Sequence, residues 1–416
     1  MEKREPKDLT IYRRRFDEDP SSFNDFQAMD YVRELKNQGL MDDAIEVGRT
    51  FLQIDEGLTG FINYYGYALY NKFINIDEKS INDKENLFYS IVDEILSITK
   101  QEKYSPYEAT INKVTRHILN TKPVDYAKLA SYLDKLGVVA LNGEPFVNKD
   151  GKEFESKKEK WYRLRVRSAY ETGDYAKCVE ASNMAFSQPL KWHYNNQNWI
   201  KYYRASALVK LERYEEAENE FLALGNRIPT GDAFEVLYSL YMNTGREKEA
   251  YQNLIYKFFN EGYGIDKLDV YEKLLDMVKT GKNTDTRALA KALVYKLKEE
   301  NDMDVSDNEI DEAYTSRDSS SLYDRFYNQL MEHLDDYIDR KEGRVAYYNS
   351  DKEFGSIYVH DEDNIFFRQS DYIYDEEVEK RDVVEYSVMK TYDAKKQRAS
   401  TKAILLKTIE QARSYD

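Results

Sequence analysis

The sequence predicts a multidomain protein in which α-helical repeats are followed by a small five-stranded β-barrel. Up to about residue 300, apolar residues recur at helical spacing and a hairpin pattern repeats along the chain. At Gly343 the pattern changes to the alternation of a β-strand, and five short strand-like segments follow within about 65 residues. The chain has 416 residues, more than one hydrophobic core usually organises, so we expect more than one folding unit.

Residues 202–217 set the register of the helical repeat. Ala205 in a first helix and Ala217 in a second are small residues that allow neighbouring helices to approach, and Tyr214 lies at the turn between them. Gly66 follows Val32 by 34 residues, which is one repeat period. Equivalent positions are found in three other hairpins: Val32, Gly39 and Ala44; Val166, Gly173 and Cys178; and Tyr238, Gly245 and Ala250.

This spacing resembles the tetratricopeptide repeat, although residues 70–151 are helical in pattern but out of register. The resemblance implies an α-solenoid, in which each hairpin buries one face against the next and the concave surface holds a protein or peptide. The unit around Val166 carries about five extra residues, in the segment 192–196. Four basic residues are candidates for the partner-binding groove, with a solvated basic face as the alternative for each: Arg163, Arg167, Lys201 and Arg204.

Composition suggests where the domains begin and end. Helical repeats occupy residues 1–300, where two helices at 267–279 and 287–300 close the array. Residues 301–321 are acidic and serine-rich and are interpreted as a linker. A connecting helix over 322–341 leads to the barrel at 342–408, and residues 409–416 form a tail.

The five strands are expected at residues 343–349, 354–359, 364–370, 383–389 and 397–405. The first begins with a glycine and a valine, followed by an aromatic pair and an asparagine: Gly343, Val345, Tyr347, Tyr348 and Asn349. Residues 352–357 (KEFGSI) and 365–368 (IFFR) follow in order. These segments resemble the opening strand and the two ribonucleoprotein motifs of cold-shock domains, over about 65 residues. The resemblance implies an OB-fold that binds single-stranded nucleic acid.

The pleat of the strands divides their residues between two faces. Phe354, Ser356 and Tyr358 share one face, as do Phe366 and Arg368, while Gly355, Ile357, Ile365 and Phe367 point into the barrel. Aromatic rings and a guanidinium plane on the outer face can stack on unpaired bases. Basic residues near them can hold phosphates, including the group Lys395, Lys396, Arg398 and Lys402. The candidate nucleic-acid-binding residues are Tyr347, Tyr348, Lys352, Phe354, Tyr358, Phe366, Arg368, Lys396 and Arg398.

Four positions depart from the cold-shock pattern, the first being Ala346, which replaces the lysine of the opening strand. Ser356 replaces the second phenylalanine of the first motif, Arg368 replaces the histidine of the second, and Gln369 replaces the aromatic residue after it. The segment 343–407 has 11 Lys and Arg against 13 Asp and Glu, so it is slightly acidic. Three hypotheses therefore stand: an adaptor whose barrel binds single-stranded RNA or DNA, a pure protein-interaction scaffold whose barrel binds no nucleic acid, and a peptide-sensing regulator built on the repeats.

Several other functions have no support in the sequence. There is no phosphate-binding glycine loop and no nucleophile elbow, and the four histidines are scattered, so we expect neither an enzyme nor a metal or cofactor site. Cys178 is the only cysteine, and it falls at a small-residue position of a repeat. The net charge of -16 argues against bulk electrostatic binding of nucleic acid. No signal peptide or membrane span is apparent, which predicts a cytoplasmic protein.

Overall fold

The computed structural model describes residues 6–55, 57–225, 232–305, 310–360, 363–393, 395–396 and 398–411. The chain forms two compact units, Met1–Asn196 and Gln197–Asp416. The division falls within the region that the sequence assigns to one array of helical repeats. It also places the C-terminal strands in the same compact unit as the helices that precede them. Each unit is described by itself.

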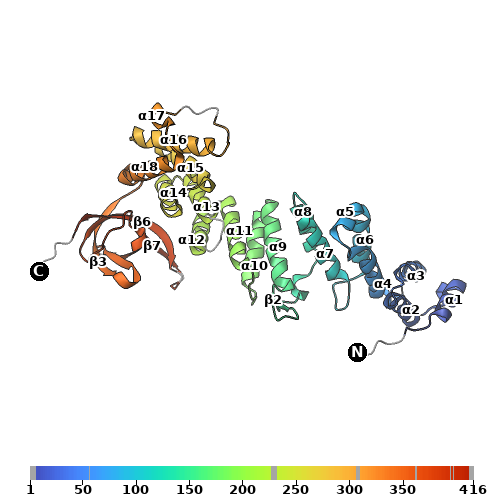
Figure 1. Ribbon diagram of the computed structural model, residues 1–416. Coiled ribbons are helices and arrows are strands. Elements are labelled where there is room, and N and C mark those ends of the chain that lie inside the picture. The colour runs from blue at the N-terminus through green and yellow to red at the C-terminus, as the bar shows by residue number, and fades with distance from the viewer. Residues whose placement is uncertain are drawn as a thin grey trace. The chain divides into compact units, whose positions relative to one another are not determined.

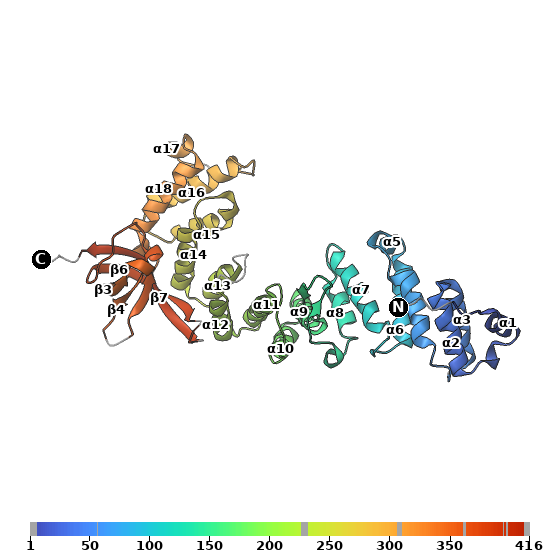
Figure 2. The same cartoon turned by 60° about the horizontal axis from the view of Figure 1, so that its bottom comes forward.

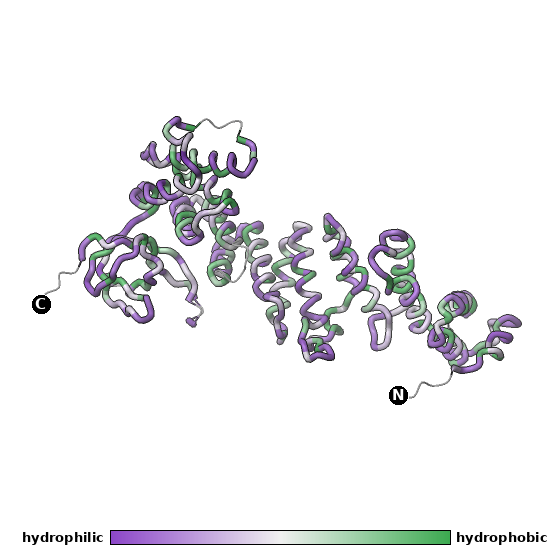
Figure 3. Tube along the Cα trace, in the orientation of Figure 1, coloured by the Kyte–Doolittle hydropathy of each residue, from purple (hydrophilic) through white to green (hydrophobic). Residues whose placement is uncertain are grey.

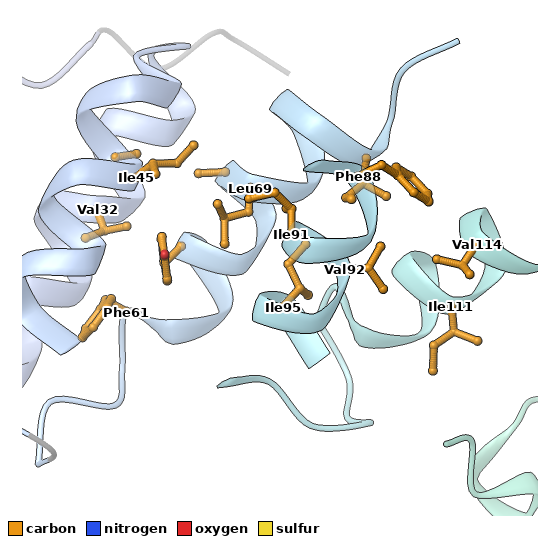
Figure 4. Close-up of a cluster of buried hydrophobic side chains, with 14 of the residues drawn as sticks. Val32, Ile45, Phe61, Leu69, Phe88, Ile91, Val92, Ile95, Ile111 and Val114 are labelled. Carbon is orange, nitrogen blue, oxygen red and sulfur yellow. The ribbon is translucent and has the colours of Figure 1, made fainter. Parts of the chain in front are cut away.

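The first unit is helical apart from one short hairpin of strands (Figure 1). Its core is formed by aliphatic and aromatic side chains that neighbouring helices contribute in turn, as Figure 4 shows for Val32, Phe61, Leu69, Ile95 and Val114. The elements are α1 (Thr10–Glu18), α2 (Asp25–Asn37), α3 (Met41–Ile54), α4 (Ile62–Leu69), α5 (Glu78–Asp83), α6 (Glu85–Ile98), α7 (Tyr107–Asn120), α8 (Tyr126–Leu133), β1 (Phe146–Val147), β2 (Glu153–Phe154), α9 (Lys157–Glu171) and α10 (Tyr175–Phe186).

The turns between paired helices follow the predicted pattern. Gly173 joins α9 to α10 with φ +76°, a left-handed conformation that glycine adopts without steric cost. In the hairpin of α11 (Asn196–Lys210) and α12 (Tyr214–Leu224), Glu212 takes the same place with φ 59°. Five residues after these two turns, Cys178 and Ala217 are fully buried, as expected for small residues at a close helix contact. Burial also raises the pKa of the Cys178 thiol to about 12.

The five extra residues of the predicted insertion hold a buried ionic cluster in the first unit. Glu159, in the first turn of α9, is fully buried. One of its carboxylate oxygens lies 2.7 Å from Nδ1 of His193, and the other accepts a hydrogen bond of 2.7 Å from the His193 backbone N–H. Nε2 of His193 lies 2.8 Å from Glu153, and the Asn196 side chain donates to Glu159 at 2.9 Å. The insertion is thus fastened to the start of α9.

We predict that this cluster makes the stability of the first unit depend on pH. Hydrogen bonds to Glu159 and then to Glu153 raise the pKa of His193. The protonated imidazolium is therefore favoured in the folded state, and its stabilisation is fully present below the ordinary pKa of about 6.5. The stabilisation is lost as the pH rises through the raised pKa. Thermal unfolding between about pH 6 and pH 9 should show this loss in the wild-type protein.

The matched control is His193→Gln, which keeps hydrogen-bond donors but does not titrate in this range. All other titrating groups are common to both proteins, so the difference between their pH profiles isolates His193. Parallel profiles for the two proteins would contradict the prediction.

The second unit combines helices with five strands (Figure 2). After α11 and α12 come α13 (Asp232–Asn243), α14 (Glu247–Glu261), α15 (Leu268–Val278), α16 (Thr284–Glu299), α17 (Glu312–Thr315) and α18 (Ser319–Glu332). The strands are β3 (Lys341–Asn349), β4 (Phe354–Tyr358), β5 (Ile365–Arg368), β6 (Val383–Asp393) and β7 (Arg398–Glu410). Each of the five strands falls where the sequence predicts one, and β6 and β7 are longer than expected.

The five strands close into a barrel in the order β3-β4-β5-β7-β6. All the pairings are antiparallel except that of β5 with β7. Ile357, Ile365 and Phe367 fill the interior, as predicted from the alternation. Gly355 is also buried, and a Cβ there would lie 2.5 Å from the Phe367 ring and 2.5 Å from the Tyr347 carbonyl oxygen. Only glycine fits at this point of β4.

The barrel packs against the helices of its own unit. Figures 1 and 2 both show it beside α12 and α14, and β6 contacts both helices. Strand β7 buries residues on both of its faces: Ala403 and Leu406 belong to the barrel core, whereas Ile404 and Leu405 belong to the core formed by α14, α15, α16 and α18. A strand buried on both faces is continuously apolar rather than alternating.

The segment predicted as linker and connecting helix differs from expectation. Residues 306–309 lie outside the described residues. The helix α18 begins at Ser319, where the Asp318 side chain caps its N-terminus, and it ends at Glu332, before β3 begins at Lys341. Phe326 of α18 is fully buried in the same core as Ile404. This helix is therefore part of the packed unit.

Polar and apolar residues alternate along the helices of both units, as the hydropathy colouring in Figure 3 shows. Such alternation is typical of amphipathic helices that bury one face. In the described part of the chain, no helix combines the length and the apolar character needed to cross a bilayer.

Candidate nucleic-acid interface

Four aromatic side chains gather on the outer face of β3, β4 and β5, and we call them the aromatic face: Tyr347, Phe354, Tyr358 and Phe366. The Tyr347 and Phe354 ring centroids are 6.2 Å apart, and those of Phe354 and Phe366 are 5.8 Å apart. Tyr347 is 49% exposed, Tyr358 56% and Phe366 40%. Large rings that remain this accessible while lying side by side form a surface suited to stacking.

Ser356 lies at the centre of the aromatic face. In the strand register it stands opposite Tyr347 of β3 and opposite Phe366 of β5, with Phe354 and Tyr358 two residues away on either side. Side chains at these positions share one face of the sheet. The serine that departs from the cold-shock pattern thus leaves a small polar residue with aromatic residues on all four sides.

A β-bulge in β3 determines which aromatic residue faces outward. The pairing of β3 with β4 shifts register between Val345 and Tyr347. Val345 is buried in the barrel, and strict alternation would bury Tyr347 with it. The shift turns Tyr347 outward and places Tyr348 on the opposite face.

Tyr348, also predicted to bind nucleic acid, lies on the opposite face of β3 from Tyr347. Its ring stacks on Phe367 of the barrel core, with centroids 6.2 Å apart and planes within 4° of parallel. Its hydroxyl donates to the side-chain oxygen of Gln369 at 2.7 Å. Tyr348 therefore packs on the barrel core and lies apart from the aromatic face.

Two predicted basic residues flank the aromatic face. Arg368 stands opposite Phe354 in the pairing of β4 with β5, and it is exposed. Its guanidinium group is therefore placed to extend the stacking surface. Lys352 is exposed in the turn between β3 and β4, where its backbone N–H donates to Asn349.

A groove of about 1250 Å³ adjoins the aromatic face, between α12 and the hairpin of β6 and β7. Phe366 and Arg368 line both the groove and the outer face of β5. Lys396 and Arg398, predicted to contact phosphates, lie in its β6–β7 wall together with Lys395. The opposite wall is formed by residues of α12: Glu215, Glu218, Asn219 and Leu222.

Glu218 anchors an ion-pair network at the α12 wall. Lys390 of β6 and Arg246 each donate to its carboxylate at 2.9 Å, as does the Tyr241 hydroxyl. Burial opposes ionisation of this carboxyl group, but the hydrogen bonds from Arg246, Lys390 and Tyr241 lower its pKa to about 2. Glu218 therefore stays ionised near neutral pH and holds Lys390 against α12.

Lys402 is grouped with the phosphate-binding residues in the sequence analysis, but in the structure its side chain is paired with a carboxylate of the same unit. Its Nζ lies 2.6 Å from Asp371, whose side chain is almost fully buried, and 3.0 Å from the Tyr256 hydroxyl on α14. The Tyr256 hydroxyl also donates to Asp371 at 2.9 Å. Lys402 thus joins the barrel to the helices.

The candidate residues of the partner groove are placed differently in the two units. In the first unit, Arg163 of α9 makes a bidentate pair with Glu155 at 2.8 and 3.0 Å. Arg167 lies 3.6 Å from Glu171 and packs over the Tyr126 ring. These arginines have carboxylate partners within the chain, which weakens the prediction that they bind an external one.

In the second unit, Arg204 of α11 forms an ion pair with Glu220 of α12. Burial raises the pKa of Glu220, against the opposing charges of Arg204 and Lys201. Both basic residues are half-buried. The charge of Glu220 on the adjacent helix thus interacts with both basic residues.

Sequence reasoning missed the α12 wall of the groove. In the sequence, the residues of this wall look like an ordinary solvated helix face. They form a groove only because α12 lies beside β6 and β7 in the folded chain. The contact of Tyr256 and Lys402 with the buried Asp371 was missed for the same reason: Tyr256 and Asp371 lie 115 positions apart in the chain.

No family model matches the chain, and no curated protein matches it.

Proposed function

We propose that the strands of residues 341–410 form an OB-fold module of the cold-shock type that binds single-stranded RNA or DNA. The helical hairpins then form a tetratricopeptide-like solenoid that binds a protein or peptide partner. The protein is, in this proposal, a non-enzymatic adaptor between the two. The observation that supports binding of nucleic acid is the aromatic face on three adjacent strands, where three rings are exposed and the fourth, Phe354, is half-buried.

Stacking supplies the affinity in this proposal. Each base that stacks on an aromatic side chain contributes about 1–3 kcal/mol, with little dependence on sequence. The net charge of -16 opposes non-specific binding of duplex, whose affinity depends mainly on phosphate contacts. Unpaired strands, whose bases are free to stack, are therefore preferred to duplexes.

Fluorescence anisotropy with the full chain tests this proposal. Labelled oligo-U and oligo-dT are expected to bind at micromolar protein concentrations, whereas a duplex of the same length binds much more weakly. Equal affinity for duplex and single strand, or no binding of either single strand at tens of micromolar protein, would count against it.

The alternative is a scaffold that binds only proteins, and Ser356 is the observation that favours it. A serine stands at the centre of the face, where the cold-shock pattern has a phenylalanine, so the stacking surface lacks its middle ring. A pull-down distinguishes the two. Partners of a pure scaffold are retained after nuclease treatment and do not change when Phe354 and Phe366 are replaced.

A further inference from the structure

The groove beside the aromatic face is larger than a site for a small molecule. Its volume of about 1250 Å³ exceeds the roughly 300–1,000 Å³ that is usual for a small-molecule pocket. It runs between α12 and the hairpin of β6 and β7, so a helix forms one wall and strands form the other. A cavity of this size and build suits a segment of a polymer.

The groove is rich in cations that have no carboxylate partner. Lys390 and Lys402 line it but are paired with Glu218 and Asp371. Four other basic residues line it, and in the described part of the chain none makes an ion pair within 4 Å: Arg368, Lys395, Lys396 and Arg398. In a chain of net charge -16, such a group marks a local preference for an anionic ligand.

Six basic residues line the groove against four carboxylates, Glu215, Glu218, Asp363 and Asp393, and two of these carboxylates have partners within the chain. Glu218 is occupied by Lys390 and Arg246. Asp393 accepts the backbone N–H groups of Lys395 and Lys396 at 2.9 and 3.1 Å, which lowers its pKa and turns it into the hairpin.

The groove and the aromatic face are continuous. Phe366 is a member of the aromatic face and also lines the groove, and Arg368 beside it does the same. A strand whose bases stack on Phe354 and Phe366 therefore continues directly between α12 and the β6–β7 hairpin. This continuity favours a nucleic-acid backbone over an acidic peptide, because the acidic side chains of such a peptide would not stack on the adjoining rings.

We propose that the groove binds the phosphate backbone of the single strand whose bases stack on the aromatic face. The binding site is then composite: the barrel supplies the rings and the four unpaired cations, and α12 supplies the second wall, where the exposed Asn219 can donate hydrogen bonds to phosphate or sugar. The inference rests on the proposed function and extends it. The helices contribute to the site directly, and its footprint is longer than the aromatic face.

The first experiment measures oligo-U of increasing length on the full chain carrying Lys396→Gln and Arg398→Gln. The control carries Lys380→Gln and Arg381→Gln, an equal change of charge at exposed residues of the barrel outside the groove. For the groove variant, we expect that the affinity no longer rises with length beyond the shortest oligonucleotide bound. The slope of log K against log salt should also fall by about 1.4, since each phosphate contact to a single strand contributes about 0.7.

The second experiment tests the helix wall by a gain of binding. Glu215→Lys places a cation in the α12 wall, whereas Glu216→Lys reverses a charge one residue away that does not line the groove. Glu215→Lys is expected to bind long oligo-U more tightly and with a steeper salt dependence than Glu216→Lys. Equal affinities for these two variants would remove α12 from the site.

The outcomes separate this inference from the function on which it rests. If the wild-type protein binds no oligonucleotide, the proposed function itself fails. If the wild-type protein binds but the groove variant and its control behave alike, the aromatic face binds nucleic acid and the groove does not. If a poly-glutamate peptide binds the wild-type protein more tightly than oligo-U and loses affinity in the groove variant, the groove is a site for acidic peptides and the inference is overturned.

Discussion

Replacing both Phe354 and Phe366 by alanine lowers the affinity of the full chain for oligo-U by at least about 30-fold. The two rings are neighbours, 5.8 Å apart, on adjacent strands. At about 1–3 kcal/mol for each stacked base, the loss of two stacking positions costs about 2 kcal/mol or more. Fluorescence anisotropy titration of the variant and the wild-type protein measures the change.

The control for this result is Tyr374→Ala, which removes another exposed ring of the same unit that lies outside the aromatic face. Its affinity should match that of the wild-type protein. Because both rings lie on the outer face of the barrel, Phe366 exposed and Phe354 half-buried, the double variant should keep its far-UV circular dichroism and melt near the wild-type temperature. An affinity that changes less than about threefold in a folded double variant would remove stacking as the basis of binding.

Replacing Lys402 by methionine destabilises the second unit by about 3–5 kcal/mol. Asp371 is fully buried, and Lys402 is its only cationic partner among the described residues, at 2.6 Å. Without that partner the carboxylate keeps, among the residues that the structure describes, the hydrogen bonds from the Tyr256 hydroxyl and the Arg368 backbone N–H. A buried charge left without its partner loses the attraction that offset its desolvation. Urea unfolding followed by hydrogen exchange in β7 and α14 measures the effect.

The double variant Lys402→Met with Asp371→Leu provides the matched comparison. It removes both charges and replaces them by apolar side chains, a change that is often close to neutral. Most of the lost stability should return. If the double variant is as unstable as Lys402→Met alone, the loss comes from packing around residue 402 and not from an unpaired carboxylate.

The sequence predicts most of the local structure correctly. Alternation places Ile357, Ile365 and Phe367 in the barrel and Phe366 on its surface, because the two faces of a strand differ sharply in burial. Gly173 marks a helix turn because a left-handed residue is needed there. These features depend on a few neighbouring residues, so they can be inferred from the chain alone.

Other features depend on contacts between distant segments. The sequence does not separate Tyr347 from Tyr348, because a bulge between Val345 and Tyr347 changes the alternation and no residue type there marks it. The predicted barrel read as a separate module because Ile404 and Leu405, which pack on the helices, look like ordinary strand residues. The groove has no local signature, since one wall comes from a helix that precedes the strands by more than 100 residues.

The most direct test of the central claim is photocrosslinking of the full chain to oligo-U that contains 4-thiouridine, followed by mass spectrometry of the crosslinked peptides. The aromatic face predicts that nucleotide is attached to peptides of β3, β4 and β5, at or beside Tyr347, Phe354 and Phe366. Crosslinks that occur only in the helices of the first unit, or that persist unchanged when Phe354 and Phe366 are alanine, would contradict the claim.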